Sequence, residues 1–543
     1  MTAPRTQPMT SAQRGTLTAA IIGSAIVFLD ATVVYLALPR IGAQLESSLL
    51  GRLEAQTYVT SGYLATLAAF LLLGGALGDY YGRRRIFIMG LALFGLTSML
   101  CGFAPNFELL VFGRVLQGVA GALLVPGSLS IIANTFEGSA RGRAFGLWAA
   151  VTSALATLGP PIGGILLEVA GWRAMFLINA PLVLAGLSFS WRSMAESKDD
   201  QATGQFDWLG ALFAAIAIGG LAFGLTRGQE ARWQDPAGFV AIGLGVVALL
   251  AFPILMLKRP NPLVPLGLFR RRDFATINLS TFLIYGALYA SAAFQALFLQ
   301  STLGYSPLGA AIVGLPTGIL LTFLSARVGT LAGRFGPRPF LVIGPLVMAV
   351  GLLWWQFVPS TSAPWTVSLD DMRAVVPPVD AIVGPFLASV VFGIGISILV
   401  APLTTALMSS VPARNSGIAS AINNALSRVG QPLVAAAVFI VVTGTFYASL
   451  AAAVPGTNPD DPALRAAYQP LNPPPPDADP QLAAAAKEAS TDAFHLAYLA
   501  AAALMLAGAA VNYVGLRPGP RPGTESTAGA TSGGASGEGS RER

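Results

Sequence analysis

The sequence predicts an all-α protein that crosses a membrane many times. Only 11% of its 543 residues are charged, whereas soluble domains carry roughly a quarter. Hydrophobic residues make up 54% of the chain, and they form repeated apolar runs of about twenty residues, the length that a membrane helix needs. The Lys and Arg residues gather in alternate loops between these runs, which is typical of a polytopic membrane protein.

Fourteen membrane helices are expected, and their order sets the topology. Most of the 32 Lys and Arg residues then fall at the chain ends and in the even-numbered loops, with Arg428 counted at a loop end. This bias places both termini in the cytoplasm. The first apolar run has no cleavage-site pattern after it, so we expect a retained helix and not a signal peptide. The expected spans are 17–39, 56–77, 85–104, 108–133, 143–168, 171–192, 208–227, 237–257, 274–299, 308–332, 339–358, 381–408, 429–452 and 492–515.

The residue types argue against several other classes of protein. The single cysteine, Cys101, excludes an internal disulfide, and the single histidine, His495, excludes a multi-histidine metal site. We therefore expect no metal and no cofactor. The sequence offers no nucleophile–histidine–acid set for an enzyme and no ring of repeated charges for a channel. Its basic residues are scattered, so no nucleic-acid partner is expected.

The stretch Gly74–Arg85, GGALGDYYGRRR, joins the second and third spans and carries more chemistry than a short loop needs. The glycines permit a tight turn and a close approach of neighbouring helices, and Asp79 can face a positive helix terminus. A basic loop that serves topology alone is the other interpretation. The positions that carry the pattern are Gly75, Asp79, Gly82, Arg83, Arg84 and Arg85.

A weaker copy of this loop occurs in the second half of the chain. Gly329 and Gly336 repeat the spacing of Gly75 and Gly82, whereas Gly333 replaces the acid. A decayed repeat is expected when two halves descend from one duplicated helix bundle. Both copies resemble the signature loop of the major facilitator superfamily. The resemblance implies two pseudo-symmetric six-helix bundles, with the seventh and eighth spans as an insertion.

With that insertion, the chain divides into five parts. The proline-rich loop should contain two short helices, starting at Asp461-Pro462 and Asp479-Pro480, where an acid is followed by proline at the first helical position. The expected parts are a cytoplasmic N-terminus (1–16), an N-terminal bundle (17–192), a linker with the two extra helices (193–273), a C-terminal bundle (274–515) with a long extracytoplasmic loop (453–491), and a disordered cytoplasmic tail (516–543).

Two ionisable residues are expected deep inside the membrane. Asp30 lies in the stretch LDATVVYLALP of the first span and Arg114 in the fourth, within a turn or two of the same depth. An ionisable group there is costly and indicates function. Each could instead be structural, Asp30 in a permanent salt bridge and Arg114 as a donor to carbonyl groups. The Asp30 stretch resembles the helix-1 motif of drug/proton antiporters, although Tyr35 replaces an asparagine usual there, and the Arg114 stretch resembles the helix-4 motif of the superfamily. Both resemblances imply a role in proton coupling.

The fifth span contains the stretch LGPPIGGILLEVAGWR. Its prolines and glycines can kink the helix and allow close contact with a neighbour, and a packing kink alone is the other interpretation. The residues Gly159, Pro160, Gly163 and Gly164 resemble a motif found in antiporters. Leu155 departs from that motif, which usually begins with a glycine. The resemblance therefore implies export.

A substrate path is expected between the two bundles. A pocket of aromatic residues with few polar anchors would suit a flat, apolar compound that can be cationic. Aromatic residues in membrane helices often only pack or face lipid, which is the other interpretation. The candidate residues are Gln117, Trp148, Asn278, Tyr285, Tyr289, Gln295 and Asn423.

The sequence is identified as a member of the fourteen-helix, EmrB/QacA-like drug/proton antiporter family. The resemblance implies proton-coupled export of drugs or other small amphipathic molecules across the cytoplasmic membrane by alternating access. An exporter of one metabolite, or a proton symporter, is the alternative. Expected partners are the substrate, protons and lipid; we expect a monomer, and a periplasmic adaptor is left open.

A conformational latch would hold the inner ends of the two bundles together in this mechanism. Asp79 is expected to bind Arg141 or Arg143 and to face the start of the thirteenth span, near Arg428. The expected latch residues are Gly75, Asp79, Gly82, Arg83, Arg84, Arg141 and Arg143.

Overall fold

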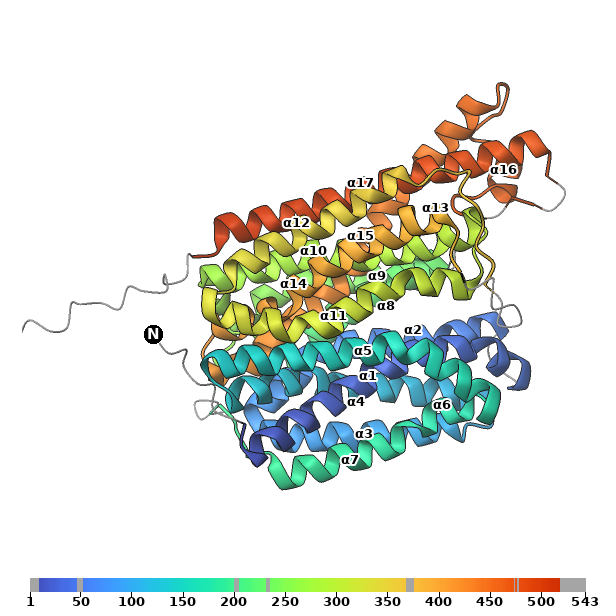
Figure 1. Cartoon of the computed structure of the whole chain (residues 1–543). Helices are drawn as coiled ribbons and strands as arrows, with labels where there is room; N and C mark the ends of the chain where they lie inside the picture. The colour runs from blue at the N-terminus through green and yellow to red at the C-terminus, as the bar shows by residue number, and fades with distance from the viewer. Residues whose placement is uncertain are drawn as a thin grey trace, which may run out of the picture.

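The computed structural model describes residues 9–45, 52–199, 205–230, 235–367, 376–472, 474–475 and 478–517. The first half of the expected N-terminal segment, residues 1–8, therefore lies outside the described residues, as does the expected tail from residue 518. Thirteen helices in the described ranges are long and apolar enough to cross a membrane. A further helix, α5 (Gly138–Ala170), is 33 residues long and runs alongside them (Figure 1). The predicted all-α fold with fourteen spans is confirmed.

The helices occur in the predicted order, and two spans are each built from more than one helix. In the first half these are α1 (Ser11–Gln44), α2 (Arg52–Tyr81), α3 (Arg83–Gly102), α4 (Phe107–Thr135), α5, α6 (Arg173–Leu177) and α7 (Asn179–Ser193), followed by the extra helices α8 (Trp208–Glu230) and α9 (Pro236–Lys258). In the second half they are α10 (Arg272–Leu297), α11 (Pro307–Phe335), α12 (Arg338–Trp354), α13 (Val379–Ala381), α14 (Leu387–Ser409), α15 (Ser416–Ala453), α16 (Pro462–Ala467) and α17 (Pro480–Gly515).

Helix ends follow the capping residues in the sequence. The Thr10 side chain accepts a hydrogen bond from the Gln13 amide at 3.1 Å, and Asn106 caps α4 in the same way. The turns after α2 and α11 each need a glycine, because Gly82 has a φ of 112° and Gly336 a φ of 79°. The repeated glycines of the sequence therefore have the same backbone role in both halves.

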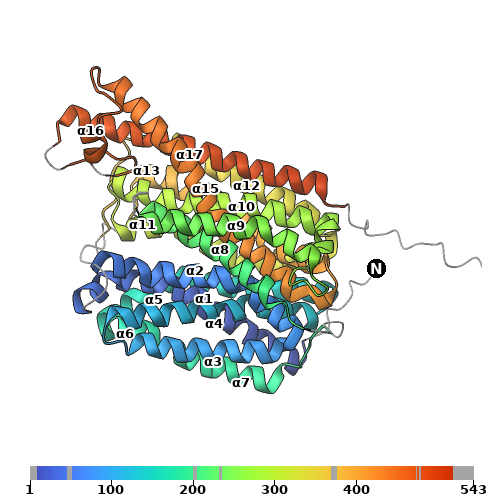
Figure 2. The ribbon, with the colours of Figure 1, turned by 180° about the vertical axis from the view of Figure 1, so that it is seen from behind.

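The two bundles lie side by side with their helices roughly parallel (Figure 1; Figure 2). We call the end where α1 begins and α17 ends the termini end, and the opposite end the α16 end. Between the bundles, α2 packs against α15, and α5 packs against α11. Each pair joins the second helix of one bundle to the fifth helix of the other, as a pseudo-two-fold arrangement requires.

The extra helices pack on one side of the boundary between the bundles (Figure 2). Helix α8 contacts both α2 and α15, and small residues let it approach α9 closely at Gly220 and Gly245. In the turn between α8 and α9, Arg227 Nε donates to Asp235 Oδ2 at 2.6 Å. The Ala237 amide and this arginine hold the pKa of the Asp235 carboxyl below its usual range.

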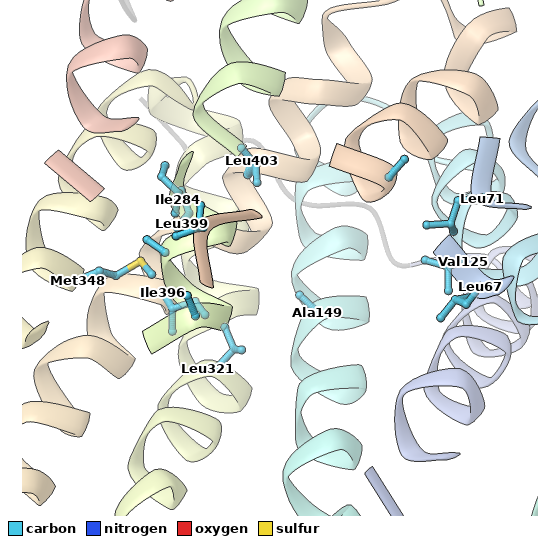
Figure 3. Close-up of a cluster of buried hydrophobic side chains, with 14 of the residues drawn as sticks. Leu67, Leu71, Val125, Ala149, Ile284, Leu321, Met348, Ile396, Leu399 and Leu403 are labelled. Carbon is cyan, nitrogen blue, oxygen red and sulfur yellow. The ribbon is translucent and has the colours of Figure 1, made fainter. Parts of the chain in front are cut away.

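Apolar side chains fill each bundle and the boundary between them. Figure 3 shows part of this core, with Leu67 and Leu71 of α2 on one side, Leu399 and Leu403 of α14 on the other, and Ala149 of α5 between them. All five are at most 3% exposed. Polar side chains inside this apolar environment are therefore costly unless they are paired.

The largest errors in the predicted helix boundaries are two helix starts. Helix α15 begins at Ser416 and not at 429, and α17 begins at Pro480 and not at 492. The first turns of both helices contain polar or charged residues, which lower the hydropathy that marks a membrane span. As a result, Arg428 lies about three turns inside α15 instead of at a loop end.

The connection between α15 and α17 is correspondingly shorter than the predicted loop 453–491. Asp461 caps the short helix α16 through the Ala463 amide, as its sequence predicts. Asp479 also caps a helix, but that helix is the long α17 and not a second short one.

Candidate functional site

Asp30 of α1 and Arg114 of α4 form an ion pair in the centre of the N-terminal bundle. Each residue is only 1% exposed. The side-chain amides of Gln117 and Asn179 each donate to Asp30 Oδ1 at 3.1 Å. The Asp30 carboxylate of α1 thus accepts hydrogen bonds from three side chains, two in α4 and one in α7.

Further contacts hold the Arg114 guanidinium in place. Its Nε donates to the Val59 carbonyl at 2.9 Å, and one Nη donates to Gln117 Oε1 at 2.8 Å. The guanidinium carbon lies 4.0 Å from the centroid of the Tyr63 ring, within range of a cation–π interaction. Because the Arg114 guanidinium keeps its charge, the pair is stable in this buried environment only while Asp30 is ionised.

Asn179 and Tyr63 were not among the predicted site residues. Asn179 begins α7, after a break at Ile178 that divides the predicted span 171–192. Its Nδ2 also donates to Ser98 Oγ at 2.9 Å, and the Tyr63 hydroxyl donates to the Val27 carbonyl at 3.1 Å. Neutral polar residues occur in many spans of this sequence, so only the three-dimensional contacts distinguish these two.

At the termini end, Asp79 of α2 contacts the first turn of α15. Its Oδ1 accepts from the Gly417 amide at 3.1 Å, and its Oδ2 accepts from the Ile418 amide at 2.8 Å. Both amides lie in the first turn of α15, where the backbone offers them no acceptor within the helix and the helix dipole favours a carboxylate. The predicted contact partner, the start of the thirteenth span, therefore lies at Gly417 and not near Arg428.

The basic partner of Asp79 is Arg83, and not Arg141 or Arg143 as predicted. Arg83 Nε and Nη2 donate to Asp79 Oδ1 at 2.9 and 2.6 Å, and Nη2 also donates to the Ala413 carbonyl at 3.0 Å. Asp79 and Arg83 are only four residues apart, on either side of the turn at Gly82, so this pairing is local. Arg141 Nε donates instead to the Phe136 carbonyl, and Arg143 Nε has no hydrogen-bond partner within the described residues.

Residues 194–199, which follow α7, bind the same loop, and we call this segment the strap. The amides of Arg84 and Arg85, in the first turn of α3, donate to the Glu196 carboxylate at 3.1 and 3.3 Å. The Asp199 amide donates to the Asp79 carbonyl at 2.8 Å. The strap therefore joins the loop at Asp79 to the chain that leads into α8.

Glycines let the bundles touch at two places near the termini end. A Cβ atom on Gly75 would lie 2.4 Å from the Gly417 carbonyl oxygen, and one on Gly142 would lie 2.6 Å from that of Gly329. Neither contact leaves room for a side chain. The two contacts occupy equivalent places in the two repeats, because Gly75 and Gly329 hold the same position in the repeated loop.

Within the proposed antiporter motif of α5, Gly159 packs against α1. A Cβ atom there would lie 2.1 Å from Thr32 Oγ1, so the glycine is needed for this close approach. Gly163 is buried. The surroundings of Pro160 and Gly164 lie outside the described part of the structure.

The predicted substrate-path residues do not form one cluster. Gln117 belongs to the Asp30 network, and the Trp148 indole is 8% exposed with no partner for its N–H among the described residues. Asn423 of α15 donates to Asn278 Oδ1 at 3.2 Å and to Thr281 Oγ1 at 2.9 Å, which joins α15 to α10. The other candidates lie on α10.

Gln295 lines a pocket of about 430 Å³ in the α16 half of the C-terminal bundle. The pocket lies between α10, α11 and α14, and its polar lining includes Ser291, Thr317 and Ser389. No charged residue is among its described lining. Its mixture of aromatic, apolar and uncharged polar groups is typical of a small-molecule site.

Two six-helix bundles in a pseudo-two-fold arrangement define the fold of a membrane transporter. The family model described as the Major Facilitator Superfamily matches residues 20–435. The chain belongs to this superfamily, which is one of transporters and not of enzymes. A solved structure of the proton:xylose symporter XylE superposes with a TM-score of 0.56 at 14% identity, over 92% of this chain and 95% of that one; this likeness concerns the fold alone.

Among its relatives are several drug-resistance proteins. The Methylenomycin A resistance protein of Bacillus subtilis (strain 168) is 32% identical over 79% of this chain and 87% of its own length. The multidrug resistance protein Stp of Mycobacterium tuberculosis is 31% identical over 78% of this chain and 75% of its own. The Tetracenomycin C resistance and export protein of Streptomyces glaucescens is 30% identical over 77% and 74%.

Proposed function

We propose that this protein is a proton-coupled antiporter that exports drugs or other small amphipathic molecules across the cytoplasmic membrane. The observation that carries the proposal is the buried pair of Asp30 and Arg114. Protonation of Asp30 would leave the Arg114 charge uncompensated in an apolar environment. Proton binding is therefore linked to a change in the packing of α1 and α4, which is the physical requirement for coupling.

Export follows if Asp30 takes its proton from outside and releases it inside while the substrate moves outward. In this proposal the termini end faces the cytoplasm, because the basic loop of Arg83, Arg84 and Arg85 lies there. The contact of Asp79 with α15 exists only while the bundles are closed at this end. We propose that it stabilises the outward-facing state, and that the protein works as a monomer with substrate, protons and lipid as its partners.

Everted membrane vesicles from a host without its own drug pumps provide the test. With an imposed proton gradient, wild-type vesicles should accumulate at least one dye or antibiotic from a panel, whereas Asp30→Asn vesicles with equal protein content should not. Asp460→Asn, which changes an exposed carboxylate near α16, is the matched control. Normal gradient-driven accumulation by Asp30→Asn would contradict the proposal, and proton-driven loss of the compound from the vesicles would indicate a symporter.

A further inference from the structure

Arg428 lies inside a membrane-spanning helix and has no counter-charge among the residues that the structure describes. It is partly exposed and sits about three turns from the first residue of α15. No described residue forms a hydrogen bond or an ion pair with its guanidinium group; its one described contact places the guanidinium carbon 6.0 Å from the centroid of the Tyr289 ring. A cation at this depth is costly and is rarely left unpaired.

Arg428 faces the boundary between the two bundles. It follows Gly417 and Ala421 at helical spacing on one face of α15, and these two residues touch Gly75 of α2 across the boundary. The unpaired cation therefore lies at the boundary between the bundles, where an alternating-access transporter carries its substrate.

The nearby acidic residues are not available to neutralise this charge. Asp30 already accepts hydrogen bonds from Arg114, Gln117 and Asn179. The described acids in the helices of the C-terminal bundle lie elsewhere: Asp273 is in the first turn of α10, Asp380 is in α13, and Glu488 and Asp492 are in the half of α17 nearest the α16 end. The compensating negative charge must come from something that enters this space.

We propose that Arg428 binds an anionic group of the exported molecule, such as a carboxylate, a sulfonate or a phosphate. A guanidinium group recognises such anions through paired, charge-assisted hydrogen bonds. The rings of Tyr289 and Tyr285, whose centroids are 6.0 Å apart, provide an aromatic surface beside the charge. The substrates are therefore amphipathic acids with an apolar or aromatic body, and cationic compounds are repelled. This inference rests on the proposed export function and differs from the sequence-based expectation of a substrate that can be cationic.

The test measures equilibrium binding to purified protein in lipid nanodiscs, without a proton gradient. Fluorescein and rhodamine 6G are suitable probes, because they share a ring system but carry opposite charges. Wild-type protein should bind fluorescein more tightly than rhodamine 6G. Arg428→Gln should weaken fluorescein binding by roughly tenfold or more, the loss expected for a charge-assisted hydrogen bond. The affinity of Arg428→Lys for fluorescein should lie between those of wild type and Arg428→Gln, because the charge stays and the forked geometry is lost.

The control is Arg334→Gln, which removes an exposed arginine at the end of α11 and should leave both affinities unchanged. Thermal unfolding of each variant shows whether it is folded. The proposal is overturned if wild-type protein has no preference for fluorescein, or if folded Arg428→Gln and Arg428→Lys both bind fluorescein as tightly as wild type. Because no gradient is used, failure here is separate from failure of the Asp30 transport test.

Discussion

The residues with the strongest energetic demands lie in the N-terminal bundle. Asp30 and Arg114 are both charged in an apolar environment, and their cost is offset by one another, by the amide groups of Gln117 and Asn179, and by the contacts of Arg114 with the Val59 carbonyl and the Tyr63 ring. The packing of α1, α4 and α7 therefore depends on whether the Asp30 carboxylate is ionised or protonated. The proton site is separate from Arg428, since no hydrogen bond or ion pair joins Arg428 to Asp30 within the described residues.

Removing one member of this pair should cost more than removing both charges. Arg114→Ala leaves a buried, unpaired carboxylate, and we expect it to lower the free energy of unfolding by about 3–5 kcal/mol and to abolish proton-driven export. Arg114→Lys should retain part of both properties. The double variant Asp30→Asn/Arg114→Gln should recover most of the stability but none of the coupling. Thermal unfolding in detergent and vesicle transport measure the two effects, and normal export by Arg114→Ala would refute this role.

A second prediction concerns the carboxylate at the termini end. Asp79→Asn keeps the size of the side chain but weakens its hydrogen bonds to the α15 amides, a loss of about 1–3 kcal/mol that would shift the closed-to-open ratio roughly 5- to 150-fold. Cysteines at Ala76 and Ile418, which line one pocket, should crosslink more slowly in this variant after Cys101→Ser. Transport should slow while ligand binding persists. Unchanged crosslinking would mean that Asp79 only shapes its own loop.

At the scale of whole helices, the sequence predicted the order of the fourteen spans and the depth of Asp30 and Arg114, because the helical rise converts sequence position into depth. It failed where a helix begins with polar residues. The first turns of α15 contain Ser416 and Asn423, so a hydropathy pattern excludes them and places Arg428 in a loop. The contact of Asn179 with Asp30 depends on how α7 packs against α1, which no local pattern encodes.

The extra helices α8 and α9 allow a test of which elements are needed for transport. Deleting Trp208–Lys258 and joining the ends with a flexible linker should lower thermal stability, because α8 packs on α2 and α15, yet measurable export should remain. A longer deletion, Ser193–Lys258, also removes Glu196 and the rest of the strap, and should reduce export further. Complete loss of export in the shorter, correctly inserted deletion would show that α8 or α9 lines the substrate path.

At the scale of the whole molecule, the two bundles meet near the termini end through two equivalent glycine contacts, of which only one also has a carboxylate. Gly75 meets Gly417 beside Asp79, whereas Gly142 meets Gly329 beside Gly333, where the repeat has no acid. The backbone contact therefore occurs in both repeats, whereas the contact of a carboxylate with a helix N-terminus belongs to the repeat that contains Asp79. Closing this end requires both glycine pairs to come together.

Adding side chains at the uncharged contact should hold this end open. Gly142→Val places methyl groups against the Gly329 carbonyl, at a cost of about 1–3 kcal/mol in the closed state only. Electron paramagnetic resonance distances between spin labels at Glu137 and Arg334 should lengthen. Gly243→Val on α9, where a Cβ atom would meet nothing within 4 Å, is the control. Identical distance distributions in both variants would contradict the contact's role in closure.

The structured connection at the α16 end has a practical consequence for imaging. Tyr447 of α15 donates to the Tyr468 carbonyl at 3.0 Å, and the Leu471 amide donates to Ser490 of α17 at 3.3 Å, so these segments are tied to the two long helices beside them. Two similar bundles are difficult to tell apart in electron micrographs of a small particle. An antibody fragment raised against the α16 segment would mark one bundle and one end, and would give every particle an unambiguous orientation.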